Sequence, residues 1–108
     1  MLIGGFIVKD GGKTVLINAK GPSLASQGVA DPIANPRLDL YQGSTIIASN
    51  DDWQTNSNAA AIAASGAGPT NSKEASLQVA LEPGLYTVVV SSADGSQGIA
   101  LVEAFGIE

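Results

Sequence analysis

The stretch EASLQVALEPGLYTVVVSS (Glu74–Ser92) decides the fold class, because it has the pattern of two strands joined by a tight turn. In its first half, apolar residues alternate with mostly polar ones, which is the two-residue period of a β-strand with one buried face. The Pro83-Gly84 pair is a turn signal, and the apolar run after it predicts the second strand. The expected buried face consists of Ala75, Leu77, Val79 and Leu81, whereas Glu74, Ser76, Gln78 and Glu82 are expected to point mostly to water.

Short apolar runs of the same kind lie on both sides of this stretch and are separated by glycine-rich or polar turns. About seven such strands are typical of an all-β fold, a two-sheet antiparallel β-sandwich of jelly-roll type. One short helix is expected at Ala59–Ala64, with Ser57 or Asn58 as its N-cap and Gly66 at its end. The expected strands are Leu2–Val8, Lys13–Lys20, Arg37–Tyr41, Thr45–Ser49, Glu74–Glu82, Leu85–Val90 and Ile99–Phe105.

Two of these strands, Leu85–Val90 and Ile99–Phe105, are apolar on both faces. A two-layer sandwich normally leaves one face of each sheet in water. The second apolar face of these strands therefore needs a cover. The loop Leu24–Pro36, the short helix or another subunit could supply it.

The composition describes one small acidic domain without the usual catalytic side chains. A chain of 108 residues suffices for a single domain, 1–108, and its net charge of −5 disfavours nucleic acid and anionic membranes as partners. It has no histidine and no cysteine, which removes the commonest general base, thiol catalysis and thiolate metal sites. No run approaches the roughly 20 apolar residues of a membrane span, so membrane insertion is not expected.

Adjacent carboxylates occur only in the loop ASNDDWQTNSN (Ala48–Asn58), which follows an expected strand. Calcium takes six to eight oxygen ligands from carboxylates, carboxamides and backbone carbonyls. A divalent ion would also relieve the repulsion between Asp51 and Asp52. The alternative is a turn in which the same side chains cap backbone amides. We expect a calcium ion (Ca²⁺) as cofactor, with Asn50, Asp51, Asp52, Asn56, Asn58 and Glu74 as candidate ligands.

Trp53 and the acidic residues of this loop allow two further interpretations. Trp53 is expected to be a core plug or an interface anchor, with a stacking platform for sugars as the alternative. Asp51 or Asp52 could form a glycosidase-like acid pair with Glu74, but the chain is short and offers no visible substrate cleft. We therefore expect that the protein is not an enzyme.

Several segments occur in the order that is typical of one class of β-sandwich module. The runs LDLYQGSTIIASNDDW (Leu38–Trp53), PGLYTVVVSS (Pro83–Ser92) and GIALVEAF (Gly98–Phe105) resemble the bacterial pre-peptidase C-terminal domains and related secreted β-sandwich modules. The opening LIGGFIV (Leu2–Val8), with KTVLINAKGPSL (Lys13–Leu24), resembles the variant found in large exported environmental bacterial proteins. The resemblance implies a jelly-roll-like sandwich, an extracellular setting, no catalytic activity and often calcium at Asn50-Asp51-Asp52.

Two non-catalytic functions fit these observations. The first is an extracellular subunit that assembles with copies of itself into a fibre, tube or layer. Relatives of this variant usually have a further strand before the LIGGF segment, so Leu2–Val8 is expected to form an open sheet edge that invites a strand from a neighbour. The alternative is an accessory module of a larger secreted protein, which binds polysaccharide or tethers an enzyme. The candidate assembly residues are Met1, Leu2, Ile3, Phe6, Ile7 and Val8.

Overall fold

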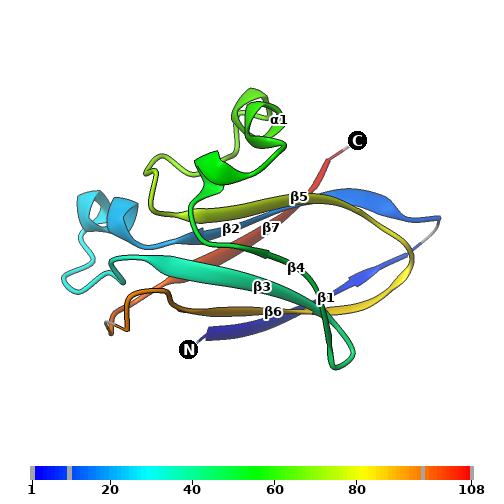
Figure 1. The fold of residues 1–108 in the computed structure, drawn as a ribbon, viewed down its shortest axis with the longest axis horizontal. Coiled ribbons are helices and arrows are strands. Elements are labelled where there is room, and N and C mark those ends of the chain that lie inside the picture. Colours follow the sequence, from blue (N-terminus) through cyan, green and yellow to red (C-terminus); the bar gives the residue numbers. More distant parts are fainter. Residues whose placement is uncertain (1, 10, 96, 108) are drawn as a thin grey trace.

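The computed structural model describes residues 2–9, 11–95 and 97–107, which form two packed β-sheets (Figure 1). The strands are β1 (Leu2–Val8), β2 (Lys13–Lys20), β3 (Pro36–Gln42), β4 (Thr45–Asn50), β5 (Ala75–Leu81), β6 (Gly84–Ser92) and β7 (Leu101–Ile107). The helices are the 3-10 turns η1 (Pro22–Gln27) and η2 (Trp53–Thr55) and the α-helix α1 (Ala59–Ala64). None of these helices has the length and apolarity needed to cross a lipid bilayer.

The predicted antiparallel sandwich is confirmed. One sheet has the order β1-β6-β3-β4 and the other the order β5-β2-β7, with every neighbouring pair antiparallel. The last strand is the least well predicted, because it begins at Leu101 rather than at Ile99. The backbone of Ile99 is instead bonded to the loop before β3: its N–H donates to Asp31 O at 2.7 Å, and its carbonyl accepts from Ile33 N at 2.8 Å.

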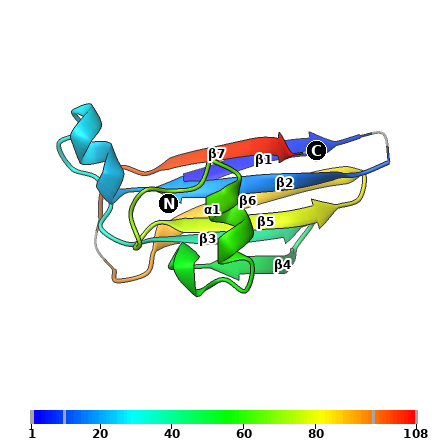
Figure 2. The same cartoon turned by 90° about the horizontal axis from the view of Figure 1, so that it is seen from above.

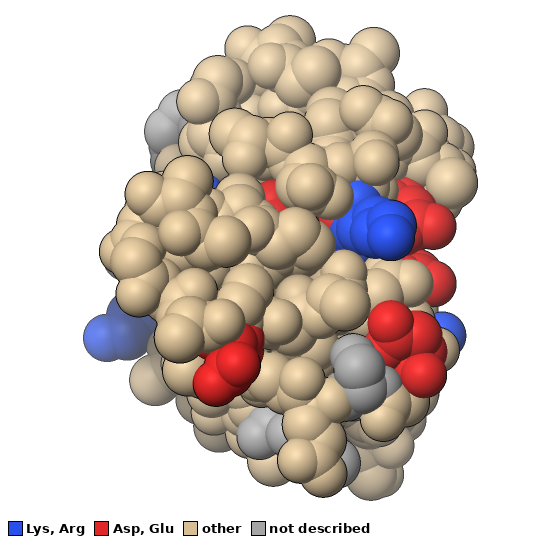
Figure 3. All heavy atoms as spheres, turned by 90° about the vertical axis from the view of Figure 1, so that its left-hand side faces the viewer, with Lys and Arg blue, Asp and Glu red and all other residues tan. Residues whose placement is uncertain are grey.

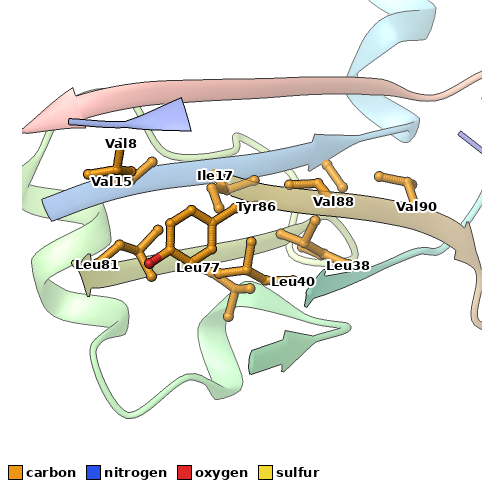
Figure 4. Packing of buried hydrophobic residues seen from close by; sticks show 12 residues of the cluster. Val8, Val15, Ile17, Leu38, Leu40, Leu77, Leu81, Tyr86, Val88 and Val90 are labelled. Atoms are coloured by element: carbon orange, nitrogen blue, oxygen red, sulfur yellow. The ribbon is translucent and has the colours of Figure 1, made fainter. Parts of the chain in front are cut away.

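The core lies between the two sheets and is built from the inward-facing positions of the strands (Figure 4). The period-two alternation places every second residue of β3 and β6 inside. Tyr86 packs against Phe6 of the neighbouring strand with ring centroids 5.5 Å apart, and its hydroxyl donates to Glu82 O at 2.7 Å. The buried cluster comprises Val8, Val15, Ile17, Ala19, Leu38, Leu40, Ala75, Leu77, Leu81, Tyr86, Val88 and Val90.

Part of the outer face of the three-stranded sheet, over β5 and β2, is covered by α1 and the segment that follows it (Figure 2), whereas Leu101 and Phe105 of β7 are 42% and 40% exposed. Leu16, on the outer face of β2, and Ile62 of α1 are both fully buried. The helix ends before Gly66, whose φ of 76° suits glycine. Gly68 passes so close that a Cβ at this position would lie 2.8 Å from Ile62 Cγ2. The short helix therefore lies over β5 and β2 rather than over the two strands that were expected to need a second cover. Leu85 of β6 and Phe105 of β7 remain 68% and 40% exposed.

The cover by α1 explains why one prediction for β5 is wrong. Ser76 and Glu74, which were expected to point to water, are both fully buried, and Gln78 is half-buried. The polar face of β5 points toward η2, α1 and the loops beside them rather than to solvent. Asparagine side chains bind the Ser76 hydroxyl and the outward backbone groups of this face, while Gln78 Oε1 is buried without a hydrogen-bond partner among the described residues.

Candidate metal site and contact surface

Three asparagines of the predicted metal loop bind the backbone of β5. Asn50 Oδ1 accepts from Ser76 N at 3.0 Å, and Asn56 Nδ2 donates to Ser76 O at 2.6 Å. Asn58 Nδ2 donates to Gln78 O at 2.8 Å, and its side chain makes no capping bond to α1, the role considered for it as N-cap. Because these backbone groups lie along a sheet edge, the three carboxamides take the place of a further strand beside β5.

Glu74 is occupied in a different way. Its carboxylate is fully buried, and Oε2 accepts from Gly21 N at 2.8 Å, from Ser23 N at 3.0 Å and from Ser23 Oγ at 2.6 Å. Oε1 accepts from Asn71 N at 3.3 Å. The carboxylate thus satisfies the first amides of η1 and fastens this turn to the start of β5.

Asp51 lies beside oxygen atoms that the sequence did not single out. One terminal atom of the Asn35 carboxamide is 2.8 Å from Asp51 Oδ1 and 3.1 Å from the carbonyl oxygen of Lys73. Both neighbours are acceptors, so there are two arrangements. If the amide nitrogen lies there, it donates to both, and the carboxamide oxygen then meets the donors on the other side of Asn35. If the amide oxygen lies there instead, it can share a cation with both acceptors. Two ligand oxygens about 2.4 Å from an ion and about 75° apart are about 2.9 Å from each other, so the spacing suits calcium.

The electrostatics around Asp51 also favour a cation. Burial raises the pKa of the Asp51 carboxyl above its ordinary value, and the nearby carboxylates of Asp52 and Asp94 raise it further. The guanidinium of Arg37 partly offsets this increase. Seen from one end, the molecule shows several patches of acidic side chains, some with a basic side chain beside them (Figure 3). A divalent ion at Asp51 would supply the positive charge that stabilises the ionised carboxyl.

The six predicted ligands are therefore divided among different partners. Asn50, Asn56 and Asn58 bind β5, and the Glu74 carboxylate binds η1 and Asn71. The backbone carbonyl of Asp52 accepts from Thr55 N at 3.0 Å and from Thr55 Oγ1 at 2.7 Å. The part of the chain that the structure describes contains no group of three or more acidic side chains around one point. An ion at Asp51 would thus depend on neutral oxygens such as those of Asn35 and Lys73.

Trp53 begins η2, next to the start of β5, and its backbone N–H donates to Glu74 O at 2.9 Å. The indole Nε1 is buried and has no hydrogen-bond partner among the described residues. Sugar-binding tryptophans usually offer an open ring face and a reachable N–H. The burial of this N–H suits the core plug or anchor better than the sugar platform.

The outer face of the four-stranded sheet carries uncovered apolar side chains on β1 and β6, beside the Arg37–Asp39 ion pair of β3. Ile3 and Ile7 of β1 are 62% and 60% exposed, and Leu85 of β6 is 68% exposed. Ile7 lies opposite Leu85 and Ile3 lies opposite Val89 in the register of β1 and β6, so these side chains are neighbours. We call the residues Ile3, Ile7, Tyr41, Ile46, Leu85 and Val89, which share this face, the outer apolar face.

Only part of the predicted assembly segment belongs to this face. Leu2 and Phe6 are half-buried against the core and Val8 is buried within it. Met1 lies outside the described residues. No family model, curated protein or solved structure matches this chain.

Proposed function

We propose that this protein is a non-catalytic, extracellular, calcium-binding β-sandwich subunit that self-assembles into a polymer. The observation that carries the proposal is the outer apolar face, on which Ile3, Ile7 and Leu85 are 62%, 60% and 68% exposed on adjacent strands. Proteins that remain monomeric seldom expose large contiguous apolar patches. The extracellular setting is supported by the resemblance to secreted β-sandwich modules.

The outer apolar face is suited to contact with another protein surface. Its three most exposed side chains lie on the adjacent strands β1 and β6, and two of them, Ile7 and Leu85, are directly opposite. A flat sheet face of this kind can pack on a second sheet about 10 Å away, as the two sheets within the domain do. The low fraction of charged residues, 14%, fits a chain whose surface is partly covered by neighbours.

Sedimentation velocity over a wide range of protein concentration tests the assembly. The wild-type protein is expected to form larger species as concentration rises. Leu85→Lys should weaken the association at least ~100-fold, because a charge would be buried at the contact without a partner. Ala80→Lys is the matched control, because Ala80 is exposed on β5 of the other sheet. A wild-type chain that stays monomeric at high concentration, with and without calcium, would contradict the assembly.

For the metal, we propose one calcium ion bound by Asp51, with Asn35 Oδ1 and the Lys73 carbonyl as neighbouring ligands. The proposal starts from the Asn35 carboxamide, one terminal atom of which lies 2.8 Å from Asp51 Oδ1 and 3.1 Å from Lys73 O, separations that hydrogen bonds from the amide nitrogen would also have. It is supported by the raised pKa of Asp51, which results from burial and then from the nearby carboxylates. Removing the ion should leave Asp51 as an ionised group in an unfavourable place.

Asp51→Asn is expected to have opposite effects with and without calcium. In excess chelator the variant should be as stable as the wild type or more stable, because it lacks the unfavourable charge. In millimolar calcium it should lose most of the wild-type increase in melting temperature, since binding stabilises only a folded state that holds the ion. Asp31→Asn, a change at an exposed aspartate, is the control and should keep the full calcium response. If excess chelator leaves the melting temperature of the wild type unchanged, no calcium ion is bound.

The pH dependence of the chelated protein follows from the same pKa. Because folding raises the pKa of Asp51, ionisation of this group lowers the free energy of unfolding, and the loss is complete above the folded-state pKa. The loss should disappear as the pH falls through that value and below the ordinary value of 3.8. Urea unfolding of wild type and Asp51→Asn in chelator should therefore converge in this acidic range. A difference that widens there would contradict the assignment.

A further inference from the structure

We propose that two copies of the chain join through antiparallel pairing of β1 with the partner's β1, with Gly5 opposite the partner's Gly5. This inference rests on the proposed self-assembly and specifies its first contact. The pairing would merge two four-stranded sheets into one continuous sheet across a two-fold axis.

The four edge strands of the sandwich differ in how they are protected. The edge of β5 is occupied by the asparagine side chains described above. β4 is interrupted by a bulge, since Leu40 pairs with Ala48 but Tyr41 pairs with Ile46. β7 carries the charged Glu103 near its centre, where it meets Lys20 Nζ at 3.2 Å. Side-chain caps, bulges and charges are the usual means of blocking an edge.

β1 has none of these protections within the described residues. Its sequence LIGGFIV contains no charged residue and no proline, and its register with β6 is continuous from Leu2 to Val8. None of the hydrogen bonds between side chains and backbone in the described chain reaches this strand. One side of β1 pairs with β6, so the other side offers N–H and C=O groups at the spacing of a strand. These N–H and C=O groups can be matched best by another extended segment of chain, so the expected partner is a β-strand.

The sequence of β1 is complementary to a second copy of itself. Gly5 is the central residue of the seven, so antiparallel pairing about Gly5 uses the whole strand. Ile3 would then lie beside the partner's Ile7 on the outer apolar face, and each pair would continue the row formed with Val89 or Leu85. A chain with net charge −5 repels its copies, and this contact brings together uncharged segments only.

The inward side of the same pairing fits as well. Gly4 would lie opposite the partner's Phe6, whose ring could cover the backbone that a glycine leaves bare. The Gly4 position has room beside it, because the nearest side-chain atom to a Cβ there would be Val102 Cγ1 at 3.7 Å. Beside β1 the seam between the two sheets opens as a groove, which has Phe6, Val8 and Phe105 among its lining residues. A second β1 would lie along this seam.

The size of the contact indicates that it is weak by itself. A strand of seven residues is about 24 Å long and presents an edge about 10 Å deep, or roughly 240 Å² per copy. Stable interfaces bury about 800 Å² per partner. The pairing should therefore be reversible and most easily detected by trapping.

Cysteine cross-linking tests the register directly, because the chain has no cysteine of its own. Gly5→Cys is compatible with the fold, since a Cβ at this position would meet Tyr86 O at 3.5 Å. Opposed residues in antiparallel strands have Cα atoms about 4.5–5.5 Å apart, within the range that a disulfide spans. Under mild oxidation, Gly5→Cys is expected to give at least ~10-fold more disulfide-linked dimer than Thr45→Cys on the edge of β4.

A second measurement does not depend on a substitution at glycine. A mixture of Ile3→Cys and Ile7→Cys should form the mixed dimer in preference to either dimer alone. If larger species form but Gly5→Cys links no better than Thr45→Cys and the mixed dimer is not favoured, β1 pairing is wrong and another surface carries the assembly. If no association occurs at any concentration, both the pairing and the proposed self-assembly are wrong.

Discussion

Glu74→Gln is expected to lower the free energy of unfolding by about 3 kcal/mol. The carboxylate is fully buried and accepts from Gly21 N, Ser23 N and Ser23 Oγ through one oxygen alone. Glutamine has nearly the same shape but replaces one acceptor oxygen with an NH₂ group. Either the Oε2 donors or Asn71 N would then face another donor, and these buried groups would lose their partner. Urea unfolding followed by tryptophan fluorescence measures the loss.

Two comparisons make the result specific to this carboxylate. Glu82→Gln changes the same functional group at an exposed position, so its effect should stay within about 0.5 kcal/mol. The calcium-induced increase in melting temperature should survive in Glu74→Gln, because the Glu74 carboxylate binds η1 and Asn71 rather than lying in the proposed site. Loss of the calcium response without loss of stability in chelator would instead make Glu74 a metal ligand.

Ile62→Ala is expected to destabilise the fold by about 2–4 kcal/mol. Ile62 is the one buried side chain of α1, and its surroundings include the backbone of Gly68. Truncation would leave a cavity and weaken the cover over the outer face of β2. Chemical denaturation gives the magnitude. Binding of a hydrophobic dye by the folded variant would show whether the helix has separated from the sheet.

Ile47→Ala provides the matched control for this change. Ile47 is 42% exposed on β4, so the same truncation there should cost well under the Ile62 value. An equal loss at both positions would mean that α1 contributes little as a cover. The helix is only six residues long and would not be stable by itself, so its order depends on this packing.

The fold could be predicted because its signals are local. The alternation in β5 and the turns between strands depend only on residues that are close in sequence. The strands and turns of the folded chain agree with these local patterns. The errors arose where a distant segment competes for the same groups. Ile99 bonds to Asp31 and Ile33 rather than joining β7, and Ser76 is buried by asparagines that lie about 20 residues earlier in the chain.

The candidate site could be predicted only in part for the same reason. The polar loop stands out by composition, but composition does not show which backbone groups Asn50, Asn56 and Asn58 would meet. Asn35 is a single carboxamide before Pro36, and the Lys73 ligand is a backbone carbonyl, which any residue carries. No sequence pattern therefore marks Asn35 or Lys73 as a neighbour of Asp51. The outer apolar face was hidden too, because LIGGFIV is apolar on both sides and only its register with β6 shows that Ile3 and Ile7 face outward.

The asparagine side chains on the edge of β5 and the bulge in β4 limit how an assembly of this protein could be extended. If β1 is the one unprotected edge among the described strands, it is fully paired once two copies have joined. The merged sheet then has no further edge of this kind. Further growth would require a different contact, for which the outer apolar face of the pair is available. Cross-linking through β1 alone should then stop at two chains, and any longer covalent ladder would have to run through the second contact.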